Sequence, residues 1–94
     1  MSERTIHALA TIDELLGALG ALPKASGSEK MIEDAEALRR AVAAFHMEAI
    51  RFRMYSVDRD IKSAGDPADA RRMYETVRHA LEEAGFHTRS HTAP

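Results

Sequence analysis

The sequence contains no cysteine and no tryptophan, and it has only three proline and five glycine residues. The lack of cysteine excludes disulfide bonds and thiolate chemistry, whether for metal binding or for redox catalysis. Aromatic residues make up only 5% of the chain, and the longest run of Ala, Leu and Gly covers residues 15–22. That run is far shorter than the roughly 20 residues of a membrane span, and no apolar segment typical of a signal peptide follows the N-terminus. We therefore expect a cytoplasmic protein without a membrane segment.

The chain also lacks a large excess of either charge, because 13 basic residues are interspersed with 15 acidic residues. Nucleic-acid binding usually requires a clustered basic surface, so we expect no nucleic-acid partner. The chain has no glycine-rich phosphate loop, no serine-nucleophile motif and no Glu-x-x-His pattern of the kind found in di-iron bundles. We accordingly expect neither a metal nor another cofactor, and the absence of these motifs favours a protein that is not an enzyme without excluding one.

What the sequence does contain is alanine, 17 residues of it, together with apolar residues at helical spacing. Alanine favours helices and close helix–helix packing, and apolar residues at steps of three and four indicate buried helical faces. We predict an all-α protein with one helical domain over residues 1–86 and a disordered polar tail over 87–94. The predicted helices cover about residues 3–22, 29–63 and 67–84.

The central predicted helix is the most informative segment, because it has neither proline nor glycine between Glu29 and Ala64. At 1.5 Å per residue it would be roughly 50 Å long. Its apolar residues form two stripes, one in each half, which differ in direction by about 120°. One partner helix cannot cover both stripes, so we expect two. The alternative is a three-helix monomer in which this helix bends near Tyr55–Asp58.

Two shorter helices would leave an apolar face of the central helix open, and a second copy of the chain would close it. We therefore predict a small interaction or regulatory module that acts as a homodimer. An uncovered face fits another helical protein equally well. The predicted interface consists of the apolar residues in the middle of the helix, which are Phe45, Met47, Ile50, Phe52, Met54 and Val57.

A second hypothesis concerns Arg39, His46 and Arg53, which follow one another at intervals of seven residues and so share one side of the predicted helix. Arginine offers a planar pair of donors to carboxylates and phosphates, and histidine offers a tunable proton. These residues predict a site for an anion or small molecule, in a binding protein or an enzyme. The alternative is structural, with Arg53 paired to an acid such as Asp13, Glu14 or Asp60 and His46 hydrogen-bonded at an interface.

Overall fold

The chain enters its first helix at Ser2, whose hydroxyl accepts a hydrogen bond from the backbone N–H of Thr5, as a serine N-cap does. The computed structural model describes residues 1–23 and 27–88. In this part of the chain it has helices and no strand, which confirms the all-α class. The four helices are α1 (Glu3–Gly20), α2 (Ser28–Ala43), α3 (Met47–Ser63) and α4 (Ala68–Glu83).

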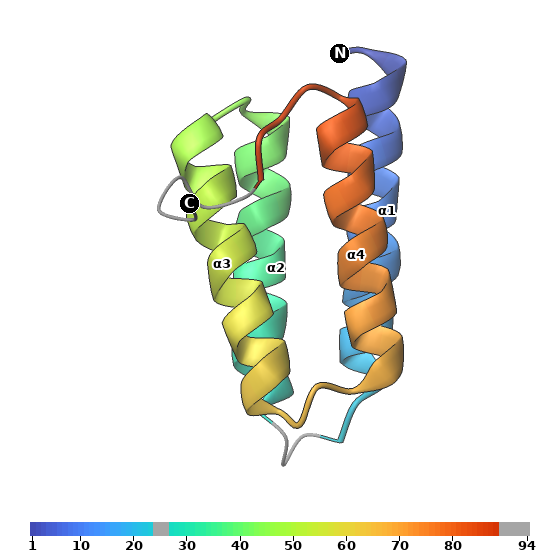
Figure 1. Ribbon diagram of the computed structural model, residues 1–94, viewed down its shortest axis with the longest axis vertical. Coiled ribbons are helices and arrows are strands. Elements are labelled where there is room, and N and C mark those ends of the chain that lie inside the picture. Colours follow the sequence, from blue (N-terminus) through green and yellow to red (C-terminus); the bar gives the residue numbers. More distant parts are fainter. Residues whose placement is uncertain (24–26, 89–94) are drawn as a thin grey trace.

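The four helices run alternately up and down in one bundle (Figure 1). Helix α1 packs against both α4 and α2, and α2 packs against α3. Among the helix pairs that contact each other, α3 and α4 approach least closely, although they are consecutive in the chain. The bundle is therefore closed by three intimate helix pairs and one looser seam, between α3 and α4.

The prediction of three helices with one long central helix is wrong, because residues 29–63 form two helices that fold back on each other. Helix α2 ends at Ala43, and α3 begins at Met47. Between them, Phe45 adopts a left-handed backbone conformation with φ of 56°. The amide N–H of Phe45 donates to the carbonyl of Val42 and that of His46 to the carbonyl of Ala41, a pattern that ends a helix and turns the chain. The break also lies before Tyr55–Asp58, where the alternative hypothesis placed a bend.

The fold-back explains the two apolar stripes without a second chain. Ile50, Met54 and Val57 are completely buried inside the bundle, in the same core cluster as Leu38 of α2 and Leu81 of α4. Each stripe thus lies on its own helix and faces the common core. The open apolar face that suggested dimerisation is covered within one chain.

The end of α4 also matches its sequence. Gly85 has a φ of 93°, and the N–H of Phe86 donates to the carbonyl of Leu81, which is a Schellman ending with glycine at its usual position. The chain then crosses the end of the bundle toward α3 (Figure 1), where the carbonyl of His87 accepts a hydrogen bond from Arg51. Thr88 is buried, so the packed region extends into the predicted tail. Residues 89–94, the rest of that tail, lie outside the described residues.

Candidate interaction surface

Arg39 and Arg53, two members of the predicted anion site, each hold an aspartate of the same chain. The guanidinium of Arg39 donates to both carboxylate oxygens of Asp13, over 2.7 and 3.2 Å. This contact joins α2 to α1, and its hydrogen bonds keep the pKa of Asp13 below its usual value. Arg53 donates to Asp34 over 3.0 Å, which joins α3 to α2. Both arginines therefore act as cross-links between helices. Arg53 pairs with an acid, as in the structural alternative, but that acid is Asp34 rather than Asp13, Glu14 or Asp60.

His46, the third member, is the N-cap of α3. Its Nδ1 accepts a hydrogen bond from the backbone N–H of Ala49 over 3.2 Å. This contact satisfies one of the free amides at the start of the helix. His46 shares no partner with Arg39 or Arg53, and the two arginines bind different aspartates. The structure does not bring these three side chains together around one ligand.

A pair of buried carboxyl groups lies between α2 and α3. Asp34 and Asp60 are 4% and 9% exposed, and they lie close enough for the pKa of each to depend on the other. Burial, and then the charge and hydrogen bond of Asp34, raise the pKa of Asp60 to about 6. Burial also disfavours the ionised form of Asp34, but hydrogen bonds from Asp60 and Lys30 and the nearby charge of Arg53 outweigh it and lower the pKa of Asp34. The pair therefore holds one proton and one negative charge over much of the acidic range.

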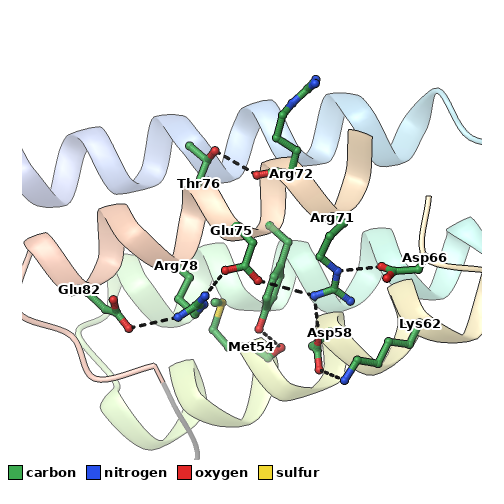
Figure 2. Close-up of polar contacts among 11 residues, drawn as sticks. Met54, Asp58, Lys62, Asp66, Arg71, Arg72, Glu75, Thr76, Arg78 and Glu82 are labelled. Atoms are coloured by element: carbon green, nitrogen blue, oxygen red, sulfur yellow. Dashed lines mark hydrogen bonds and ion pairs between the residues drawn. The ribbon is translucent and has the colours of Figure 1, made fainter. Parts of the chain in front are cut away.

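The seam between α3 and α4 is held by polar side chains rather than by close helix contact (Figure 2). Arg71 donates to Asp58 over 2.6 Å and to Asp66 over 2.8 Å. One turn further along α4, the hydroxyl of Tyr74 donates to the carbonyl of Met54 over 3.1 Å, and burial raises the pKa of Tyr74 to about 12. These contacts join residues of the same chain and explain how the seam is closed. The donors and acceptors that they use are not available to a ligand.

Some residues of the predicted interface lie in the core, and others lie on the surface. Ile50, Met54 and Val57 are in the core, and Met47 is half-buried beside it. Phe45 and Phe52 remain exposed, at 56% and 57%. Only these two large apolar side chains of the predicted set are available to another molecule.

The prediction missed Tyr55, which lies one turn from Phe52 on α3 and is 58% exposed. Arginine side chains lie over both rings, with Arg53 at 5.1 Å from the centre of Phe52 and Arg59 at 5.9 Å from that of Tyr55. The spacing of Phe52 and Tyr55 by three residues was visible in the sequence. It was overlooked because the helix was assumed to bury its apolar residues against a second copy.

Together with Glu48 and Arg59, these rings form one exposed line along α3, which we name the outer stripe: Glu48, Phe52, Tyr55 and Arg59. Its members are separated by four, three and four residues, so they follow one face of the helix. The opposite face of α3 carries Ile50, Met54 and Val57 into the core. The outer stripe is therefore held on a helix whose position is fixed by the bundle.

Across residues 1–23 and 27–88, no three His, Asp or Glu side chains are grouped so that they would hold a metal ion. No helix in the same part of the chain is both long and apolar enough to traverse a bilayer. Comparison of the chain with protein-family models, with curated proteins and with solved structures finds no match.

Proposed function

We propose that this chain is a small helical interaction module that binds another macromolecule through the outer stripe of α3. The observation that carries the proposal is the exposure of Phe52 and Tyr55, which lie one turn apart and are 57% and 58% exposed. Single exposed apolar residues are common on protein surfaces, but adjacent exposed rings are typical of contact sites.

The composition of the surface supports a protein partner. Tyrosine, phenylalanine and arginine are enriched in protein interfaces, and tyrosine and arginine often contribute most of the binding energy. Arg59 already lies over the ring of Tyr55, so its guanidinium group is placed to meet a carboxylate of a partner while the ring is covered. Because α3 is fixed by its buried face, binding would cost little conformational entropy in the backbone.

The anion-site hypothesis is less well supported, because Arg39 and Arg53 are each bonded to an aspartate and His46 caps α3. A ligand would have to displace these internal contacts. Nucleic-acid binding would use the same arginines and rings, but Glu48 lies in the outer stripe and Asp58 and Asp60 are on the same helix. We therefore favour a protein partner.

Photo-crosslinking in the native host tests this proposal without assuming a partner. A benzoylphenylalanine is placed at Phe52 in one variant and at Ile6 in a control variant. Ile6 is a suitable control because it is 54% exposed and lies on α1, away from the outer stripe. We expect a discrete protein adduct from position 52 and none from position 6. Equal labelling at both positions, or an adduct of nucleic acid at position 52, would overturn the proposal.

A further inference from the structure

The outer stripe of α3 has an order of residue types that becomes complementary to itself when its direction is reversed. From the N-terminal side it runs acid, aromatic, aromatic, base: Glu48, Phe52, Tyr55, Arg59. The spacing of four, three and four residues is symmetric about the midpoint between residues 53 and 54. A second identical helix that runs in the opposite direction would therefore present a ring to each ring and the opposite charge to each charge.

Resting on the proposed function, we infer that the occupant of this surface is a second copy of the chain, with α3 packed antiparallel to its own copy around a twofold axis. In this register Phe52 lies opposite the partner's Tyr55, and Glu48 lies opposite the partner's Arg59. The twofold axis repeats both contacts, so four rings would be covered and two ion pairs formed. An interface of this kind uses the same patch on both copies, as twofold dimers do.

Charge selects the antiparallel direction. In a parallel pair, Glu48 would face the partner's Glu48 and Arg59 the partner's Arg59, which is repulsive at both ends. Glu48 makes no ion pair or side-chain hydrogen bond with any other residue that the structure describes. Within residues 1–23 and 27–88, Arg59 lies over the Tyr55 ring and forms one ion pair, with Asp60 at 3.7 Å. Both charges of the outer stripe are thus available to a partner.

The size of the surface sets the strength of the pairing. From residue 48 to residue 59 the stripe covers about 16 Å along the helix, so the contact is smaller than those of permanent dimers. Contacts that bury less than about 1,200 Å² in total are usually transient. The pairing is therefore reversible, and the fraction of dimer rises with protein concentration in a sedimentation experiment.

Charge reversal tests both the partner and the direction. Glu48→Arg alone places arginine opposite arginine, and Arg59→Glu alone places glutamate opposite glutamate. Each variant should self-associate at least about tenfold more weakly than the wild type. A mixture of the two restores both attractive pairs, so heterodimers should form although neither variant pairs with itself. Glu14→Arg, the same change at an exposed position of α1, should leave self-association unchanged.

The lack of cysteine allows a second measurement that does not depend on how Arg59→Glu folds. Glu48→Cys and Arg59→Cys chains are mixed under mild oxidation. Disulfide-linked dimers should join one chain of each kind, and neither chain alone should cross-link efficiently. Efficient linkage within Glu48→Cys alone would instead indicate a parallel pair and overturn the antiparallel arrangement.

The outcomes separate this inference from the proposed function. Suppose that wild-type chains associate and that the double variant Phe52→Ser/Tyr55→Ser does not. If the mixed charge variants and the mixed cysteine variants then fail to pair, the twofold register is wrong but the interaction surface remains. If the chain stays monomeric and its position-52 adduct is a different protein, the second copy is the wrong occupant. If position 52 gives no specific protein adduct and the chain stays monomeric, both proposals fail.

Discussion

Asp60 shows how burial of one side chain makes the stability of the bundle depend on pH. Burial and the nearby Asp34 raise the pKa of Asp60 from 3.8 to about 6. The folded state therefore binds a proton more readily at this position than the unfolded state does. The contribution of Asp60 to the free energy of unfolding falls as the pH rises from about 4 to about 6, and it stays unfavourable at higher pH.

Asp60→Asn should therefore raise the free energy of unfolding by about 2 kcal/mol at pH 7.5. The amide keeps a donor toward Asp34 without the buried charge. Near pH 4, where the folded protein already holds the proton, the same change should have little effect. Urea unfolding at both pH values measures the difference.

Asp58→Asn is the matched control on the same helix, and it should act in the opposite direction. Burial disfavours the charge of Asp58, but hydrogen bonds from Arg71 and Lys62 outweigh it and lower the pKa of Asp58. Removal of that charge should destabilise the protein at pH 7.5. If Asp60→Asn also destabilised it at pH 7.5, the charge on Asp60 would be a favourable one, and the account of the pair would be incorrect.

Helices α2, α3 and α4 each end with a residue in the left-handed backbone conformation, but only α3 and α4 have glycine there. At the ends of α3 and α4, Gly65 and Gly85 have φ of 91° and 93°, and glycine is the usual residue at this position. At the end of α2 the same position is filled by Phe45, with φ of 56°. Phenylalanine has no preference for this conformation, so no residue type marked the end of α2.

Two substitutions at Phe45 test this helix end, because a helix end and a continuous helix predict opposite orders of stability for the two variants. Both Phe45→Gly and Phe45→Ala lose the ring that lies 6.0 Å from the ring of Phe86. Glycine adopts the left-handed conformation without strain, so Phe45→Gly should be more stable than Phe45→Ala by about 1 kcal/mol. In a continuous helix alanine would be the more stable by about 1 kcal/mol. Thermal or urea unfolding of the two variants measures the order.

For the molecule as a whole, the helical class, both outer helices and most core positions could be predicted from the sequence, and the fold-back could not. The clue was present, since the apolar stripe changes direction near Phe45. If the direction of the apolar stripe changes by about 120° along one helix, two partners are needed to cover it. A break in the helix with reversal of the chain explains the same pattern without a second partner. The candidate surface was hidden for a related reason: a continuous helix covered by a second copy would bury both Ile50 and Phe52, whereas α3 buries Ile50 and leaves Phe52 exposed.

Aspartate substitutions at these neighbouring positions therefore distinguish a complete single-chain core from a core shared between two chains. Ile50 is fully buried, and a carboxylate there costs several kcal/mol, which approaches the 5–15 kcal/mol stability of a typical domain. Ile50→Asp should lose most helical circular dichroism at 25 °C. Phe52→Asp should keep its helical signal and unfolding midpoint, because Phe52 lies outside the core, and should lose only self-association.

Light scattering and circular dichroism on the same samples separate the two arrangements. If the core were shared between copies, Ile50→Asp would give a folded monomer, and the wild-type unfolding midpoint would rise steeply with protein concentration. With the core closed inside one chain, the midpoint of Phe52→Asp should be independent of concentration. A folded, monomeric Ile50→Asp protein would mean that α3 meets its copy through the face assigned here to the core, and the outer stripe would lose its role.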